Sequence, residues 1–202
     1  KQSSFATGKG GSGATPQGTT DAQKGLDSGN SNASSQSGSD SGSSNVKVAA
    51  TVAVNFMEAT NQALVASGIT LGSSGDAKVG AVGHFDGQAL GTATSTDIAS
   101  DTGVAGAVAV NIGLATNVAR VGESTITADS VAVRAVMADD AVNTWKVRAL
   151  AGAVSGGDGI GGSIGVNYLD VTTLADVQNG ANLTATAGNI DVVAVSHNEL
   201  QN

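Results

Sequence analysis

Larger apolar residues alternate with smaller or polar residues at a period of two along much of the chain after residue 45. Valine or alanine stands at every second position from Val46 to Val54, and similar alternation recurs over residues 131–136 and 145–154. Successive side chains of a β-strand point to opposite faces, so this pattern predicts strands. We expect the Val, Ile and Ala side chains to face a core and the polar side chains to face solvent.

Helix is the alternative interpretation for the alanine-rich stretches. Gly152 and the glycines within residues 156–162 oppose a long helix there, and so do the frequent β-branched residues. Short turn signals, such as Ser67-Gly68 and Asn179-Gly180, separate the predicted strands. Two longer segments rich in Gly and Asp, residues 91–106 and 155–163, are expected to be loops between larger units.

Three asparagines mark an internal repeat. Asn55, Asn111 and Asn167 each follow a stretch of the type Val-Ala-Val, and they are 56 residues apart in both intervals. A fixed period of this size is typical of repeat architectures. With about 20–28 residues per coil, each unit would hold two or three coils of a solenoid.

The repeat divides the chain into a leading segment and three units. Residues 1–45 are dominated by Gly, Ser, Thr, Asn, Asp and Gln, so they cannot bury enough apolar surface to order themselves alone. We interpret them as a flexible linker or, alternatively, as a long insertion that closes a preceding repeat. The units are residues 46–103, 104–163 and 164–202, and the predicted fold class is all-β, a parallel β-solenoid.

Composition favours a narrow core and excludes several classes of function. Aromatic residues are 2% of the chain, Gly occurs 29 times, and Ala and Val carry most of the 40% hydrophobic content. The net charge of −8 opposes binding to nucleic acid or to anionic lipid. We expect no membrane span, because no apolar run approaches the ~18 residues that a spanning helix needs. Cysteine is absent, which excludes disulfides and Cys-ligated zinc. Because Lys1 is not a start residue, we expect an excerpt of a longer protein or a processed product.

The repeated motifs support a family resemblance. Val-Ala-Val-Asn, Ala-Thr-Asn, Ile-Thr-Ala-Asp-Ser and Val-Ala-Val-Arg-Ala all occur within residues 104–155 and recur in modified form through residues 46–202. The chain resembles giant bacterial surface exoproteins, the filamentous-haemagglutinin-like and leukotoxin-like adhesins. The resemblance implies a right-handed parallel β-helix in the stalk of a secreted or surface-anchored adhesin, and it implies no catalytic residues.

The two histidines of the chain, His84 and His197, occupy equivalent repeat positions. Asp86, Asp140 and Glu199 follow two residues after that position in the three units. A histidine beside a carboxylate is compatible with a metal site or with acid–base chemistry. We expect solvent-facing positions instead, because the two histidines are two units apart and would lie tens of ångströms from each other at several ~4.8 Å coils per unit.

Two further sets of polar residues have structural interpretations. Asn55, Asn111 and Asn167 are interpreted as a stacked ladder that stabilises the coils, rather than as a binding row. Asp97, Asp101 and Asp158 lie in the Gly-rich segments between units and are weak candidates for calcium ligands. Their spacing matches neither an EF-hand nor the tandem calcium nonapeptide, so no cofactor is expected.

These observations predict a structural stalk or adhesive module of a large exoprotein, located outside the cell or on its surface. The expected partners are a host or neighbouring cell surface, a glycan or extracellular matrix, and other copies of the chain through the solenoid ends. The alternative function is a self-assembling extracellular filament or sheath subunit. An enzyme that acts on polysaccharides is the third hypothesis, and we expect no enzymatic activity because the sequence contains no convergent catalytic motif.

Overall fold

The computed structural model describes residues 2–10, 19–22, 33–39, 46–97, 101–138 and 141–202. Strands dominate this part of the chain, and it contains no helix long and apolar enough to cross a membrane. In chain order the strands are β1 (Gln2–Gly10), β2 (Thr19–Ala22), β3 (Ala33–Ser39), β4 (Val46–Val65), β5 (Thr70–Gly72), β6 (Ala77–Gly83), β7 (Gly87–Asp97), β8 (Thr102–Val121), β9 (Thr125–Ala128), β10 (Val131–Met137), β11 (Asn143–Ser155), β12 (Asp158–Val177), β13 (Asn182–Ala185), β14 (Ile190–Ala194) and β15 (Asn198–Gln201).

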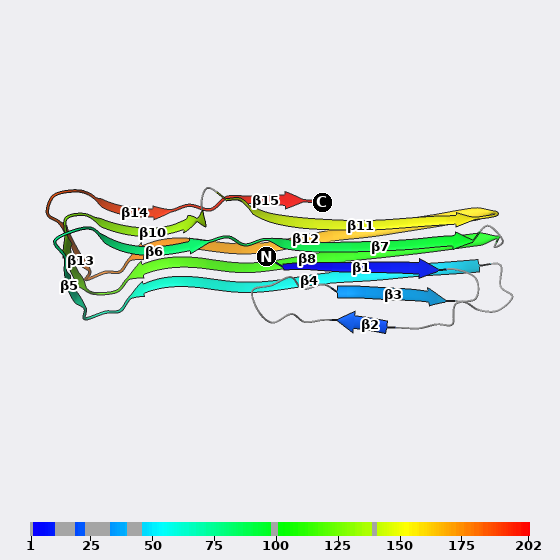
Figure 1. Cartoon of the computed structure of the whole chain (residues 1–202), viewed down its shortest axis with the longest axis horizontal. Coiled ribbons are helices and arrows are strands. Elements are labelled where there is room, and N and C mark those ends of the chain that lie inside the picture. The colour runs from blue at the N-terminus through cyan, green and yellow to red at the C-terminus, as the bar shows by residue number, and fades with distance from the viewer. Residues whose placement is uncertain (1, 11–18, 23–32, 40–45, 98–100, 139–140) are drawn as a thin grey trace.

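Four consecutive strands make one coil of a parallel β-solenoid. β4 to β7 form the first coil, β8 to β11 the second and β12 to β15 the third, and equivalent strands pair in parallel. Figure 1 shows the long strands of the coils running side by side, with the short strands β5 and β13 at one end. The predicted all-β parallel solenoid is confirmed.

Each 56-residue unit is a single wide coil. Asn55 pairs directly with Asn111, and Asn111 with Asn167, so the prediction of two or three coils per unit is wrong. The reason is strand length: β4, β8 and β12 each contain 20 residues, or about 66 Å of extended chain. Two histidines two units apart are therefore only about 10 Å apart along the stacking direction, rather than tens of ångströms.

The Gly-rich segments expected as loops between units are largely strand. β7 runs to Asp97, β8 begins at Thr102, and β12 begins at Asp158. Ala93 and Ser95 of β7 are fully buried, so the small residues of this segment line the interior. Glycine and alanine mark a narrow coil here rather than a turn.

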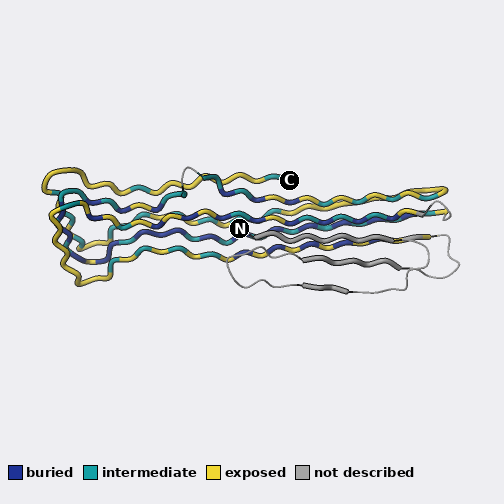
Figure 2. Tube along the Cα trace, in the orientation of Figure 1, coloured by how far each residue is buried: buried dark blue, intermediate teal, exposed yellow. Residues whose placement is uncertain are grey.

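The interior between the two long layers consists mainly of alanine. Ala53 and Ala109 of the long strands pack against Ala89 and Val147 of the returning strands, and a second alanine cluster continues the contact. Over residues 49–57 of β4 and 103–115 of β8 the buried positions carry mainly Ala, with Gly, Thr, Asn and Met57 among them, while the larger residues between them are exposed on β4 and half-buried on β8. Figure 2 shows this alternation of buried with exposed or half-buried positions along the two strands. Val118 and Val121, near the end of β8, are buried. The period-two alternation is confirmed, but the expectation that the valines within these two ranges face the core is wrong. Small side chains inside allow the two layers to approach closely.

Larger side chains fill the wider parts of the interior. Val121, Ile126 and Val133 belong to the cluster at the end that holds β5, β9 and β13. Trp145 is buried beside Met57 and Phe85 in the middle of the coil. A Cβ atom at Gly113 would lie 2.1 Å from the Trp145 ring, so this glycine makes room for the indole.

Positive φ angles occur at two equivalent turns. Gly68 and Gly180 follow β4 and β12, with φ angles of 81° and 87°. Glycine adopts this conformation at low cost because it has no Cβ atom. Gly68 N donates to Glu123 O at 2.7 Å, which joins this corner of the first coil to the second.

Three strands lie within the leading segment. β1 pairs in parallel with β7, with Gln2 opposite Gly87, and Gly87 lies opposite Trp145 of β11. β1 therefore lies next to β7 in the same way as β7 lies next to β11, one strand further along the same sheet. β2 and β3 form an antiparallel pair, and β3 pairs antiparallel with β4 at residues 48–50. Residues 1, 11–18, 23–32 and 40–45, on which much of the linker prediction falls, lie outside the described residues.

Candidate functional site

The three repeat asparagines form a hydrogen-bonded ladder inside the solenoid. Asn55 Nδ2 donates to Asn111 Oδ1 at 2.7 Å, and Asn111 Nδ2 donates to Asn167 Oδ1 at 2.9 Å. Asn55 is 0% exposed and Asn111 is 1% exposed. The ladder ties each coil to the next, and its first two rungs present no surface for a binding partner.

Two shorter amide ladders repeat the same arrangement. Asn61 Nδ2 donates to Asn117 Oδ1 at 2.9 Å, and Asn143 Nδ2 donates to Asn198 Oδ1 at 2.9 Å. Asn117 and Asn143 are buried, and Asn143 Oδ1 also accepts from Phe85 N at 2.7 Å. The buried amide side chains therefore find hydrogen-bond partners on the neighbouring coil, as buried polar groups require.

The histidine positions do not converge on one cleft. His84 Nε2 lies 3.3 Å from Asp86 Oδ1 and 3.2 Å from Val142 O, at an exposed edge. Asp86 Oδ1 also accepts from Thr144 N at 2.8 Å, so this carboxylate fastens the first coil to the second. His197 and Glu199 are exposed on the third coil, and Asp140 lies outside the described residues.

The aspartates proposed as calcium ligands lie where one coil passes into the next. Asp158 N donates to Asp101 O at 2.8 Å, and Ser155 Oγ donates to Asp158 O at 2.7 Å. Both are turn contacts, and the two aspartates take part in them through their backbone atoms. The side chain of Asp97 is outside the described part of the chain. Among the side chains that are described, no three His, Asp or Glu residues gather in a group that would hold a metal ion.

The outward face of the sheet β4–β8–β12 carries an extended apolar surface, which we call the valine face. Its residues form four rows that cross all three coils, and each row contains one residue from each long strand. Val52 is 55%, Phe56 52% and Ile164 61% exposed. The rows are Val48, Val104 and Ile160; Val52, Val108 and Ile164; Val54, Val110 and Val166; and Phe56, Ile112 and Tyr168.

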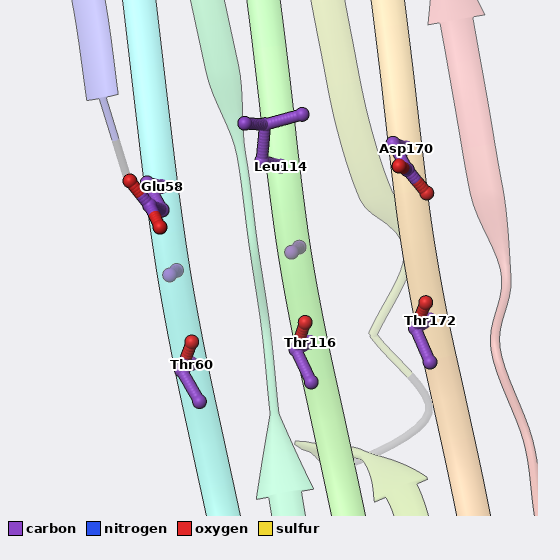
Figure 3. A pocket seen from close by; sticks show the side chains of 8 residues that line it. Glu58, Thr60, Leu114, Thr116, Asp170 and Thr172 are labelled. Carbon is purple, nitrogen blue, oxygen red and sulfur yellow. The ribbon is translucent and has the colours of Figure 1, made fainter.

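A shallow polar hollow adjoins the valine face on the same sheet. Glu58, Leu114 and Asp170 form the row after Phe56, and the next outward row contains three threonines. The hydroxyls of Thr60, Thr116 and Thr172 all lie on the side of the Glu58–Leu114–Asp170 row (Figure 3). The hollow has a volume of about 140 Å³, and it is a candidate binding site within the described part of the chain.

Sequence reasoning missed this hollow, although its signal was present. Thr60 and Thr116 are the middle residues of two Ala-Thr-Asn motifs 56 residues apart, and Thr172 has the equivalent place in the third unit. Glu58 and Asp170 are far apart in sequence, and only the pairing of one coil per unit brings them to neighbouring rungs on either side of Leu114. These residues point outward because the alternate positions of β4 and β8, which carry mainly small residues, face the interior, and β12 follows their register.

The opposite layer of the solenoid has different outward residues. On β7 they are Gln88, Leu90 and three threonines, and on β11 they are Lys146, Arg148, Leu150, Gly152 and Val154. Leu90, Leu150 and Val154 are the larger apolar residues among them. The four apolar rows of the valine face have no equivalent on β7 and β11, although Val82 of β6, which is 57% exposed, pairs with Val136 of β10 in a single outward apolar row.

No protein-family model, curated protein or solved structure matches the chain.

Proposed function

We propose that this chain is a structural and adhesive β-solenoid module of a large secreted or surface-anchored bacterial exoprotein. The observation that carries the proposal is that three coils in register present the same kinds of side chain in rows on the outside. Thr60, Thr116 and Thr172 are the clearest row. A surface that repeats along an axis suits an extended partner, because each coil contributes an equivalent contact.

A glycan chain is the partner whose chemistry fits the hollow best. Sugars offer hydroxyl groups and apolar ring faces, and the hollow combines threonine hydroxyls and two carboxylates with the neighbouring aromatic row. Glu58 and Asp170 accept hydrogen bonds from hydroxyls, and Phe56 and Tyr168 supply exposed ring faces. The net charge of −8 favours neutral over acidic polysaccharides.

Binding to a panel of immobilised neutral and acidic polysaccharides tests this proposal. Thr116→Val and Tyr168→Ala each remove one contact from a repeated row, so we expect each to weaken binding several-fold without abolishing it. Thr94→Val is the matched control, because Thr94 points outward from the opposite layer. Equal weakening by the control, or no binding to any polysaccharide, would contradict the proposal.

A glycan hydrolase is the second candidate, and one observation favours it. Glu58 and Asp170 line the same hollow two strands apart, about 10 Å between backbones, and glycosidases use paired carboxylates. Both side chains are exposed and no enclosure excludes water from them, which favours binding over catalysis. Release of reducing ends from a bound polysaccharide, lost in Glu58→Gln with binding retained, would establish the enzyme instead.

A further inference from the structure

The valine face is large for an exposed apolar surface. Rows 48 to 56 span about 30 Å along the strands, and three strands at ~4.8 Å spacing give a projected area of roughly 400 Å². Monomeric proteins rarely expose contiguous apolar patches above a few hundred Å², and patches of about 300–600 Å² are often functional. Figure 2 shows exposed positions recurring along β4 and half-buried positions recurring along β8.

The face is ridged rather than flat. Between the rows of Val48 and Val52 lies a row of small residues, Ala50, Gly106 and Gly162. A Cβ atom built at Gly106 or Gly162 would meet no other atom within 4 Å. The small row is therefore an open groove between two ridges of β-branched side chains.

We propose that the valine face packs against the valine face of a second copy of this chain, with a ridge of each copy in the groove of the other. This contact and a glycan bound along the row of Phe56 and Tyr168 would exclude each other. Sheets pack face to face at about 10 Å separation by interdigitating side chains in this way. The groove accommodates a ridge with the same strand spacing and side-chain size. The valine face of another copy supplies such a ridge. The partner is thus a solenoid with the same repeat.

Charge also favours a second copy at this face over other parts of the surface. The chain carries a net charge of −8, so two copies repel each other. The four rows of the valine face and the groove contain no charged residue, and the opposite layer has Lys146 and Arg148 exposed. Two copies therefore desolvate no ionised group when they meet through their valine faces.

The area that two valine faces would bury determines how strong an association we expect. Two faces together remove at least about 800 Å² in projection, and interdigitated ridges remove more. Specific interfaces begin near ~1,200 Å², so three coils should associate reversibly and in a concentration-dependent way. Added salt should strengthen the association, because it screens the repulsion between the two negative chains.

Sedimentation equilibrium of the purified chain over a wide concentration range tests the proposal. We expect a reversible monomer–dimer equilibrium that shifts toward dimer as salt is raised. Val52→Lys combined with Val54→Lys should reduce the association constant at least tenfold, because it would place ammonium groups in the interface. Leu150→Lys combined with Val154→Lys is the matched control, with similar exposure (41% and 54%) on the opposite layer, and it should leave the equilibrium unchanged.

A second variant tests the ridge-in-groove packing. Gly106→Val fills the groove, and it should keep the fold because nothing lies within 4 Å of the new Cβ atom. We expect it to lower the association constant several-fold, while Gly152→Val, on the opposite layer and equally open, has no effect. Thermal melts of all variants report the fold.

Three results would overturn the proposal. They are a chain that stays monomeric at every concentration, equal loss of association in the variants and their controls, and unchanged or stronger association of Gly106→Val. Adsorption of a monomeric chain to uncharged phosphatidylcholine vesicles would assign the valine face to a lipid surface instead of a second copy.

Discussion

The alanine interior and the valine face belong to the same strands but have opposite compositions. Inward positions of β4 carry Ala53 and Asn55, whereas the adjacent outward positions carry Val52 and Val54. Most sheets place their larger apolar residues inside. The inversion shows that close approach of two long layers limits side-chain size inside, while the outside is free of that limit.

The opposite layer shows that the outward valines are not a requirement of the fold. β7 and β11 enclose the same interior, and they carry Gln88, Arg148 and several threonines on their outer side. A polar outer surface is therefore compatible with this coil. The packing of a single copy therefore does not account for the valine face, and the proposed contact with a second copy would.

The largest expected effect lies at the wide end of the interior, where valines do face inward. Val133 is 0% exposed, and Arg134 beside it points to solvent with its Nη2 atom 3.4 Å from Asp191 Oδ2. Val133→Asp would bury an unpaired carboxylate and should lower the free energy of unfolding by about 3–5 kcal/mol. Arg134→Asp should cost less than about 1 kcal/mol. Denaturant titration of both variants measures the difference, and equal losses would contradict the assigned faces.

A glycine pair on one strand compares the two sides directly. Gly113→Val would force the new side chain against Trp145, which a Cβ atom alone would approach to 2.1 Å, so we expect a loss of about 3 kcal/mol. Gly106→Val, on the outer side of the same strand, should leave stability unchanged or slightly higher, because valine favours strands. Thermal melts at low protein concentration decide this, and a tolerant Gly113 would mean that the indole lies elsewhere.

The asparagine ladder offers a comparison between a buried and a half-buried rung. Asn111→Ala removes the middle rung, which bonds to both neighbours, and should cost about 1–3 kcal/mol. Asn167→Ala should cost less, because solvent reaches the third coil and replaces the lost bonds. Urea unfolding of the two variants gives the ranking, and the reverse order would argue against a ladder that stabilises from within.

The smallest expected effect is that of the outward valines on the stability of a single copy. Val54→Thr changes an exposed side chain and should alter stability by no more than about 0.5 kcal/mol. Ala53→Val at the adjacent inward position overfills the alanine layer and should cost about 1–3 kcal/mol. Calorimetry below the concentration of self-association is the appropriate measurement. A larger loss for Val54→Thr would place the valines in the core after all.

The repeat, the strands and the parallel fold could be predicted from sequence, because alternation and a fixed interval between Asn55, Asn111 and Asn167 are local signals. Which face of each strand is buried could not be predicted, since a period of two is the same whichever face points inward. Coil width was equally hidden: a 56-residue interval fits one wide coil or several narrow ones. The hollow depends on both unknowns, because Glu58 and Asp170 become neighbours of Leu114 only when one unit is one coil.

Cysteine scanning tests the central claim most directly, because the chain contains no cysteine of its own. Single cysteines would be placed at residues 52 to 57 of β4, and each variant would be treated with a soluble thiol reagent at low protein concentration. The assigned faces predict rapid labelling at Val52, Val54 and Phe56 and protection at Ala53, Asn55 and Met57. Protection at the valines and labelling at the alanine would contradict an alanine interior with a valine face outside.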